Sequence, residues 1–302
     1  MPNIPTRFVI WLGKLLRLDE FMARYAGAAE DRRKFDLYVQ NMRRLDQKTP
    51  PKFYRKFLQI SHEDVLGFPL YIMTGLHGKS DKVVLYFHGG GYSVGPLIPQ
   101  WARMRDLVEA SLCTVALLDY PKSPEYQCEK TLQVCMKAFD DLAARFGAEN
   151  LILLGDSAGG GLALALSMRR KAEGLSLPSH LVLLSPWLDV SMSHPEIVDF
   201  EELDLSLDRE GLRVQGNYYR GSLPEHHPWV SPIFGDMNGQ PSMDVYVGTH
   251  ELFYPDCRDF SEKNKDKGVT FHAYEGMQHD WMMMPIAEGD QTLAEVAAII
   301  GK

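Results

Sequence analysis

Residues 151–160 read LILLGDSAGG, and they are the most informative stretch of the chain. Four consecutive apolar residues lead into the pattern Gly155-x-Ser157-x-Gly159, and an Ala- and Leu-rich helical segment follows. A short strand that is apolar at every position is typical of a parallel sheet covered by helices on both faces. Glycines flanking a strand-to-helix turn relieve its steric clashes, and the serine hydroxyl then projects from the sheet edge. We therefore expect Ser157 to be a nucleophile, with an ordinary serine in a glycine-rich turn as the alternative.

Short β-rich runs alternate with helical patterns on both sides of this stretch. Such alternation predicts a doubly wound, mostly parallel α/β sheet, with the loops that carry chemistry at the carboxyl ends of the strands. The candidate strands are 53–60, 68–74, 82–88, 113–119, 150–155, 180–185, 243–248 and 269–274, and the candidate helices are 98–111, 127–146, 158–173, 255–266 and 290–300.

The N-terminal part of the chain has a different pattern. Apolar residues recur at helical spacing over 8–25 and 35–45, and Pro50-Pro51 end the pattern. The first 60 residues carry 13 Lys and Arg against 6 Asp and Glu. We expect residues 1–50 to form a helical cap segment. Contact of this basic amphipathic stretch with an anionic membrane is the alternative.

A second interruption of the alternation covers residues 186–241. This stretch holds six prolines and an acidic run, and it is too long for an ordinary connection between two strands. We expect a partly helical lid inserted into a catalytic domain that spans 51–302. The alternative is a surface excursion with no role at the site.

A second glycine motif, His88-Gly89-Gly90-Gly91-Tyr92, directly follows the candidate strand 82–88. Three consecutive glycines let the backbone approach a ligand closely, and their N–H groups can point at one oxygen. Together with the N–H of Ala158, the amides of Gly89, Gly90 and Gly91 are expected to form an oxyanion hole. A flexible loop is the alternative, and we expect His88 to brace the loop.

A serine hydroxyl is a weak nucleophile and needs a general base. His279 follows the last candidate strand, so its loop lies at the same sheet edge as Ser157, and His250 is the rival. The pair His226-His227, with His194, raises the question of a metal site. Adjacent histidines in a Pro-rich segment are more often surface residues, so we expect no metal.

The base in turn needs an acid that fixes its tautomer, and the expected chain order is serine, acid, histidine. Glu251, in the loop after strand 243–248, is the preferred candidate. Asp256 is the alternative, although it can equally cap the next helix. Asp280 is a poor candidate, because adjacent residues rarely orient each other's rings.

Composition narrows the functional classes further. The 302 residues are 45% hydrophobic and 24% charged with a net charge of −8, which is typical of a globular protein and argues against general nucleic-acid binding. No apolar run approaches the ~20 residues of a membrane helix, and no signal-peptide pattern is visible. Four cysteines without metal spacing favour a reducing compartment. We expect a cytoplasmic protein.

Taken together, the motifs resemble those of the hormone-sensitive-lipase-like branch of the α/β-hydrolases, the bacterial family IV esterases. The resemblance implies an α/β-hydrolase fold with a mostly parallel eight-stranded sheet, helices on both faces and a helical cap. It implies Ser157 as nucleophile, His279 as base and Glu251 as acid, where the family more often has Asp. The features that carry it are His88–Tyr92, Asp119-Tyr120 with Pro124-Glu125, the glycine-rich stretch 155–160, and Ser185-Pro186-Trp187 with Asp189.

Two departures from the family pattern affect the surroundings of the site. Pro121-Lys122-Ser123 stand where the family usually has Arg-Leu-Ala, and Asp280-Trp281 stand where it usually has Gly-Phe. The three methionines at 282–284 are candidates for an apolar acyl pocket, although ordinary core packing is favoured.

The expected reaction is hydrolysis of small, short-acyl esters without cofactor or metal, because a capped pocket suits small substrates. An amidase or deacetylase on the same triad is the first alternative. A non-catalytic small-molecule receptor is the second, and the complete triad argues against it. We expect no nucleic-acid partner and no stable membrane insertion, and a homodimer is one alternative for the oligomeric state.

Overall fold

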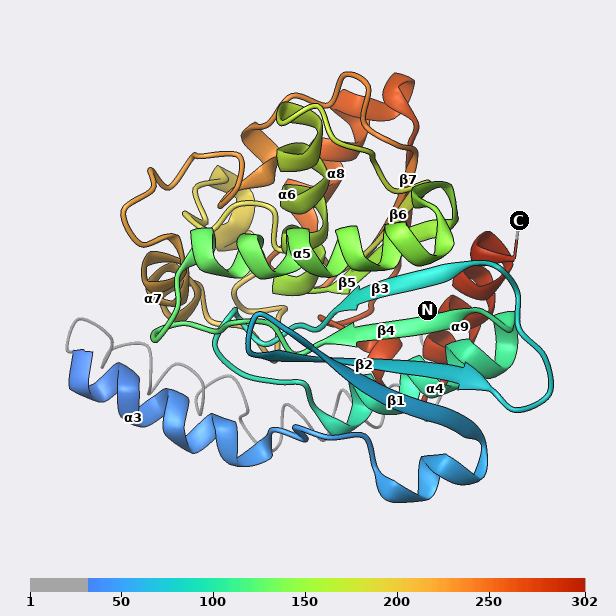
Figure 1. Cartoon of the computed structure of the whole chain (residues 1–302). Coiled ribbons are helices and arrows are strands. Elements are labelled where there is room, and N and C mark those ends of the chain that lie inside the picture. Colours follow the sequence, from blue (N-terminus) through green and yellow to red (C-terminus); the bar gives the residue numbers. More distant parts are fainter. Residues whose placement is uncertain (1–31, 302) are drawn as a thin grey trace.

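A computed structural model of the chain describes residues 32–301, so the predicted helix over 8–25 lies outside the described residues. An eight-stranded sheet runs through the molecule in the order β1-β2-β4-β3-β5-β6-β7-β8 (Figure 1). The β1–β2 and β2–β4 pairs are antiparallel and all the others are parallel, which confirms the predicted fold class. The strands are β1 (Leu58–Val65), β2 (Phe68–Gly75), β3 (Val83–Phe87), β4 (Thr114–Leu118), β5 (Leu151–Asp156), β6 (His180–Leu184), β7 (Met243–Gly248) and β8 (Val269–Tyr274).

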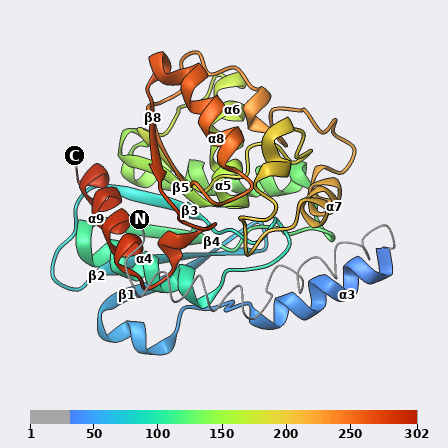
Figure 2. The same ribbon diagram turned by 180° about the vertical axis from the view of Figure 1, so that it is seen from behind.

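Helices cover both faces of the sheet (Figures 1 and 2). Neighbouring residues of the central strands therefore enter different cores: Leu153 packs on the α5, α6 and α8 side, and Leu154 packs on the α4 and α9 side. This two-sided burial explains why the central strands are apolar at every position. The helices are α4 (Ile98–Ser111), α5 (Cys128–Phe146), α6 (Ala158–Ala172), α8 (Tyr254–Asn264) and α9 (Ala287–Ile300).

The predicted strand over 53–60 is wrong in its first half. Residues Lys52–Lys56 form a short 3₁₀ helix, η2, and β1 begins only at Leu58. Tyr54 alone is buried in η2, so its aromatic neighbours do not mark a strand. The polar second half of β1 escaped detection because β1 is an edge strand whose outer residues face solvent.

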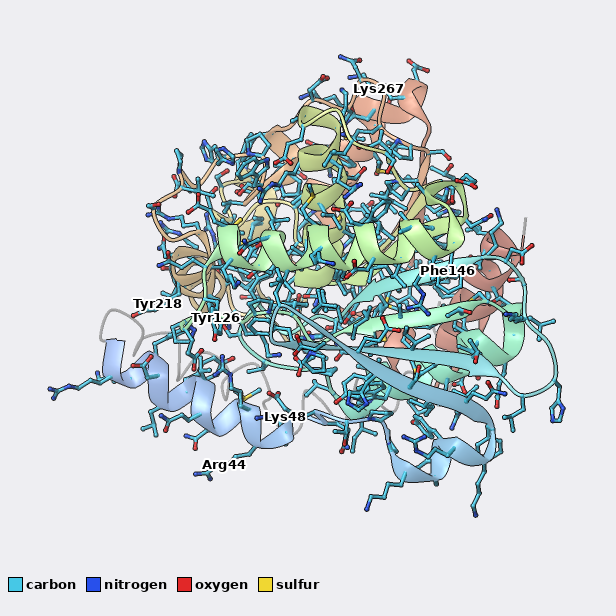
Figure 3. All side chains as sticks on the ribbon, in the orientation of Figure 1. Arg44, Lys48, Tyr126, Phe146, Tyr218 and Lys267 are labelled. Carbon is cyan, nitrogen blue, oxygen red and sulfur yellow. The ribbon has the colours of Figure 1, made fainter. Side chains whose placement is uncertain are left out.

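Two further helices lie at the carboxyl edge of the sheet, outside the layered core. The helix α3 (Arg32–Met42) precedes the sheet, and α7 (Arg209–Arg220) belongs to the predicted lid. Phe35 of α3 stacks on Tyr218 of α7 with ring centroids 4.1 Å apart, and Figure 3 shows Tyr218 close to α3. The remaining short 3₁₀ helices are η1 (Arg43–Leu45), η3 (Ala148–Asn150), η4 (Pro195–Asp199), η5 (Pro232–Phe234), η6 (Lys265–Lys267) and η7 (Trp281–Met283).

Membrane-spanning character was searched for over the same part of the chain. From residue 32 to residue 301, no helix has both the length and the apolar character needed to cross a bilayer.

Candidate active site

Ser157 occupies the turn between β5 and α6, with φ 53° and ψ −122°. Two glycines make this turn possible. A Cβ on Gly155 would lie 2.2 Å from the carbonyl oxygen of Gly159, and a Cβ on Gly159 would lie 2.0 Å from that of Phe87. The amide of Ser157 donates to the carbonyl oxygen of Leu184 at 2.8 Å. The hydroxyl is thus held at the sheet edge, where the N-terminus of α6 favours negative charge.

His279 lies in the loop after β8 and reaches Ser157. Its Nε2 is 3.0 Å from Ser157 Oγ, and the residue is 7% exposed. The ring packs edge-on against Phe253, with centroids 5.1 Å apart. The rival His250 lies in the loop after β7, where its amide donates to the carbonyl oxygen of Met277. The structure therefore brings His279 to Ser157.

Glu251 approaches the other nitrogen of the imidazole. Its Oε1 is 3.6 Å from His279 Nδ1, and its Oε2 accepts a hydrogen bond from Ser185 Oγ at 2.8 Å. Glu251 is fully buried, and this burial raises its pKa, although the nearby His279 and the hydrogen bond from Ser185 oppose the shift. The alternative acid, Asp256, lies in the first turn of α8, and within residues 32–301 no ion pair or hydrogen bond joins it to His279.

Asp280 was set aside by the sequence argument, yet it contacts the same imidazole. Its Oδ2 lies 3.3 Å from His279 Nε2, the nitrogen that faces Ser157. The residue has φ 54°, a left-handed conformation that suits the glycine usual in the family. The signal in the sequence was an aspartate in place of that glycine. Its position next to His279 in the chain did not show that its carboxylate would lie toward Nε2.

A buried carboxylate holds the start of the glycine loop. Asp156 accepts hydrogen bonds from Tyr86 Oη at 2.5 Å and from Gln100 Nε2 at 2.7 Å, and the amide of Gly89 is a further partner. A Cβ on Gly89 would lie 2.5 Å from the same carboxylate. Gly89 is therefore tied to the strand that precedes Ser157. Its amide was expected in the oxyanion hole, but it donates to Asp156 instead. Burial raises the pKa of Asp156, and these hydrogen bonds act against the shift.

His88 braces the loop, as predicted. Its Nδ1 is 2.7 Å from the carbonyl oxygen of Gly89, and its ring stacks on Tyr120 at 4.3 Å. The hydroxyl of Tyr120 in turn donates to the carbonyl oxygen of His88 at 2.6 Å.

The next two glycines have backbones that other residues rarely adopt, with φ 114° at Gly90 and φ 59° at Gly91. A Cβ on Gly91 would overlap Gln215 Oε1 of α7, so the loop and the lid touch here. The amides of Gly90, Gly91 and Ala158 donate to no acceptor within the described residues. These three N–H groups are therefore available to one external oxygen.

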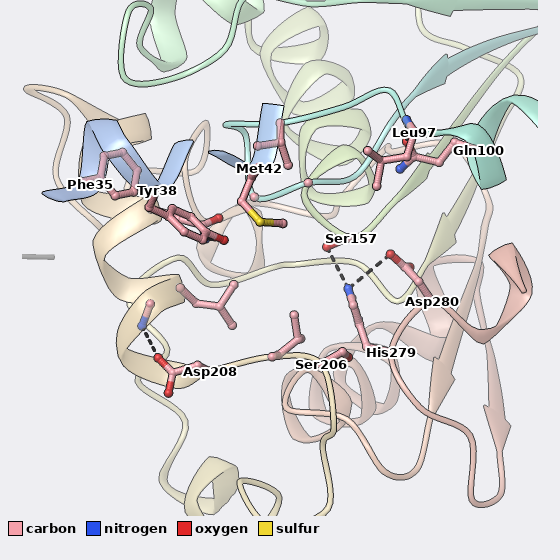
Figure 4. A pocket seen from close by; sticks show the side chains of 17 residues that line it. Phe35, Tyr38, Met42, Leu97, Gln100, Ser157, Ser206, Asp208, His279 and Asp280 are labelled. Carbon is pink, nitrogen blue, oxygen red and sulfur yellow. Dashed lines mark hydrogen bonds and ion pairs between the residues drawn. The ribbon is translucent and has the colours of Figure 1, made fainter. Parts of the chain in front are cut away.

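Ser157 and His279 open onto a cavity of about 220 Å³ (Figure 4). The helix α3, the glycine loop, α7 with the segment before it, and the loop after β8 supply its walls. Met282 and Met283 do not line it; they are buried near α4 and α9, which confirms the expectation of core packing. The lining residues are Phe35, Tyr38, Met42, Gly90, Gly91, Val94, Leu97, Gln100, Ser157, Ser206, Leu207, Asp208, Gly211, Leu212, Gln215, His279 and Asp280.

One lid segment is bonded to both loops of the site. Gln278, next to His279, donates from Nε2 to the carbonyl oxygen of Leu203 at 3.0 Å and accepts at Oε1 from the amide of Leu205 at 2.8 Å. Asp204, between them, accepts from the amide of Leu252 at 2.9 Å. Residues 203–205 thus connect the neighbour of Glu251 with the neighbour of His279.

The other histidines of the lid have separate partners. His194 Nε2 lies 3.0 Å from Asp259 Oδ2, and His226 Nε2 lies 3.4 Å from Ser191 Oγ. Between residues 32 and 301, no three His, Cys, Asp or Glu side chains are grouped as metal ligands.

Known proteins share this arrangement of elements. A family model described as an alpha/beta hydrolase fold matches residues 84–283, a range that contains the glycine loop, Ser157 and His279. An esterase of Acinetobacter venetianus is 32% identical over 238 residues, which are 74% of this chain and 78% of that protein. An acetyl-hydrolase of Streptomyces hygroscopicus is 30% identical over 208 residues, which are 67% of this chain and 69% of that protein.

Solved structures give the same picture. The crystal structure of a hormone-sensitive lipase from a metagenome library matches this chain with a TM-score of 0.81 at 25% sequence identity. The match covers 100% of this chain and 99% of that one.

Proposed function

This chain belongs to the hormone-sensitive-lipase-like branch of the α/β-hydrolase family and is a carboxylic ester hydrolase, and from that premise we propose that it hydrolyses small, short-acyl esters through Ser157, His279 and Glu251. The observation that carries the proposal is the 3.0 Å contact between His279 Nε2 and Ser157 Oγ at the floor of the cavity. A nucleophile and a base within hydrogen-bond reach, with a third group on the base, form the arrangement that acyl transfer needs.

In the first half of the reaction, Ser157 Oγ attacks the acyl carbon while His279 Nε2 takes its proton. Glu251 keeps the imidazole in the right tautomer and stabilises the imidazolium. The free amides of Gly90, Gly91 and Ala158 bind the oxyanion of the tetrahedral intermediate, while Gly89 holds their loop in place. Loss of one such donor costs on the order of 3 kcal/mol in the barrier.

The imidazolium then gives its proton to the leaving alcohol, and an acyl-enzyme remains on Ser157. In the second half, His279 takes a proton from water, which attacks the acyl carbon. The bond between Ser157 Oγ and the acyl carbon then breaks as the imidazolium returns the proton to Ser157 Oγ, and the acid is released. In this scheme the reaction uses Ser157 and His279 at the cavity, the buried Glu251 behind the imidazole, and the backbone amides beside Ser157.

The size of the cavity supports the proposed preference for short acyl chains. Its volume, about 220 Å³, lies below the roughly 300–1,000 Å³ of typical ligand pockets. Phe35 and Tyr38 of α3 and Leu207 and Leu212 of the lid supply aromatic and aliphatic side chains to its lining. The acetyl-hydrolase relative acts, by its name, on the shortest common acyl group. We assign the N-terminal segment and the lid 186–241 to one cap that limits substrate size.

A cytoplasmic location is part of the proposal. The four cysteines, all buried and free, suit a reducing compartment (the cysteines are Cys113, Cys128, Cys135 and Cys257).

The experiment compares wild type and Ser157→Ala on p-nitrophenyl esters from acetate to dodecanoate. We expect activity to peak at the short esters and to fall by at least about a thousandfold in the variant. Ser61→Ala, an exposed serine on β1, is the matched control and should behave as wild type. Highest activity on long-chain esters would contradict the argument from cavity size. If the protein hydrolyses p-nitroacetanilide but none of the esters, the amidase alternative is favoured.

A further inference from the structure

Two groups compete for one nitrogen of His279. Ser157 Oγ lies 3.0 Å from Nε2, and Asp280 Oδ2 lies 3.3 Å from the same atom (Figure 4). A neutral imidazole with its proton on Nδ1, as Glu251 favours, has a lone pair on Nε2 that accepts the serine proton. A proton held between Nε2 and Asp280 removes that lone pair from use.

Asp280 is held firmly in this position. Its amide donates to Ser185 Oγ at 3.4 Å, the same hydroxyl that binds Glu251. The side chain is 23% exposed and lines the cavity, and its Oδ1 is buried without a hydrogen-bond partner in residues 32–301. None of the described lining residues is Lys or Arg. His279 is therefore the group on which the Asp280 charge acts most directly.

Other acidic groups lie near the pair formed by His279 and Asp280, and they come from several different elements. Asp156 approaches from β5, Glu251 from the loop after β7, and Asp204 from the lid. The hydroxyl of Tyr86 on β3 is also near Asp280. Burial and these carboxylates raise the pKa of Asp280, against the effect of His279.

The same surroundings act on the imidazole. Burial alone would lower the pKa of His279, but Asp280, Glu251 and Asp204 outweigh it and raise the value to about 10. The 3.3 Å contact between His279 Nε2 and Asp280 Oδ2 places one proton between the two groups, and the raised pKa of each group favours its retention.

We propose that Asp280 is a positioning residue that competes with Ser157 for His279 Nε2 and so sets the pH above which the imidazole is free to act as a base. This inference rests on the proposed role of His279. In the resting pair, the Nε2 proton is directed at Asp280 Oδ2. When that proton leaves to solvent, the Nε2 lone pair becomes available and accepts the hydroxyl proton of Ser157. Asp280 itself forms no bond to the substrate.

The first experiment measures kcat/KM for p-nitrophenyl acetate against pH in wild type, Asp280→Asn and Asp280→Gly. Asparagine and glycine both tolerate the left-handed backbone at this position, so neither substitution strains the loop. We expect the acidic limb to move to lower pH by at least about one unit in both variants, which is about a tenfold gain relative to the plateau at pH values below the wild-type limb. Glu275→Gln, which removes an exposed carboxylate from the same loop, should leave the limb in place.

A second measurement avoids deacylation and substrate binding. The rate at which a small fluorophosphonate labels Ser157 reports directly on activation of the hydroxyl, and its pH dependence should shift in the same way. In wild type, the limb should lie well above pH ~6.5, the ordinary value for imidazole. If both variants fail to fold, a wild-type limb at or below pH 6.5 still overturns the proposal.

The outcomes separate the two proposals. If Asp280→Asn and Asp280→Gly lose activity uniformly at all pH values without moving the limb, Asp280 has a merely structural role. If Ser157→Ala remains active, the proposed function itself fails, whatever the Asp280 variants do. A limb that moves in the Asp280 variants, together with an inactive Ser157→Ala, supports both.

Discussion

The two sides of the cavity differ in the size of the packed core that supports them. Ser157 and His279 lie on the sheet side, and Phe35 and Tyr38 lie on the cap side. Both sheet-side residues follow parallel strands, and the strand before Ser157 is buried throughout. On the cap side, α3 belongs to a cluster whose buried members among residues 32–301 are Phe35, Tyr38 and Val39. In the proposed function, the chemistry therefore lies on the part of the molecule with the largest core, and the proposed limit on substrate size lies on a part whose described residues form a small core.

This difference separates two kinds of mutational effect. A change in a central strand or in the turn that follows it affects the main cores, because these cores pack on the two faces of the sheet. A change in the α3 cluster alters the cavity wall and leaves most of the buried area untouched. The variants below test this separation.

The largest effect is expected for Gly159→Ala. The new Cβ would lie 2.0 Å from the carbonyl oxygen of Phe87, and the next nearest atoms, in Phe87 and His88, are also backbone atoms that cannot rotate away. We expect a loss of more than about 4 kcal/mol in the free energy of unfolding, or no soluble protein. Urea unfolding measures it. Gly301→Ala, where the added Cβ meets nothing closer than 3.4 Å, is the control, and equal effects in the two variants would refute the argument.

Matched truncations compare the two regions directly. Phe139 of α5 is fully buried with the Arg170 guanidinium 3.9 Å from its ring centre, so Phe139→Ala should lower the free energy of unfolding by about 3–5 kcal/mol. Phe35→Ala should lower it by only about 1–2 kcal/mol, because its cluster is small, and should raise KM several-fold. Urea unfolding and KM for p-nitrophenyl acetate decide the matter. If both variants lose the same free energy of unfolding and KM is unchanged in Phe35→Ala, the proposed difference between the sheet side and the cap side is wrong.

A pH experiment probes the border between the core and the lid. Burial, with Asp189 and Asp259 nearby, raises the pKa of Asp256 to about 8, from about 4 in the unfolded chain. The folded state then binds more protons between these values, so the free energy of unfolding should fall by on the order of 3 kcal/mol from pH 5 to pH 8. Asp256→Asn should remove most of this slope and be more stable than wild type at pH 8. A slope that is the same in both proteins would show that other groups cause it.

The smallest effect is expected at the anchor of the segment after α3. Arg43 pairs with Glu125 at 2.6 Å, but the Glu125 side chain is 55% exposed. Arg43 also donates to the carbonyl oxygens of Ser93 and Ser123, each at 2.8 Å. Glu125→Gln should therefore change the midpoint of thermal unfolding by less than the equivalent of about 1 kcal/mol. If Glu125→Gln lowers stability more than Phe35→Ala does, the ion pair between Arg43 and Glu125 stabilises the cap more than the apolar cluster of α3 does.

Much of the fold was predictable because the central strands are apolar at every position and are separated by clear helical patterns. The motif order also predicted which loops meet: Ser157, Glu251 and His279 lie together after β5, β7 and β8. Their roles remain predictions. The edge strand β1 was placed poorly, because its solvent-facing residues carry no apolar pattern.

The contacts that the sequence could not predict are those between distant or adjacent polar groups. Asp280 reaches Nε2 of its own neighbour only because the backbone at 280 is left-handed, and a sequence does not state a dihedral angle. Gln215 meets Gly91 only because α7 folds back over the glycine loop. Such contacts depend on the path of the lid backbone. The proline content and charge of the lid do not predict this path.

The three residues 203–205, through their bonds to Gln278 and Leu252, also decide how lids can be exchanged between related enzymes. If residues 203–205 of the recipient are replaced together with the rest of the lid, the bonds that join the loops of Glu251 and His279 are lost. A graft that keeps residues 203–205 of the recipient replaces α7 and the part of the cavity wall that α7 supplies. The natural unit of exchange therefore begins after Leu205, nineteen residues beyond Pro186, where the lid leaves the sheet.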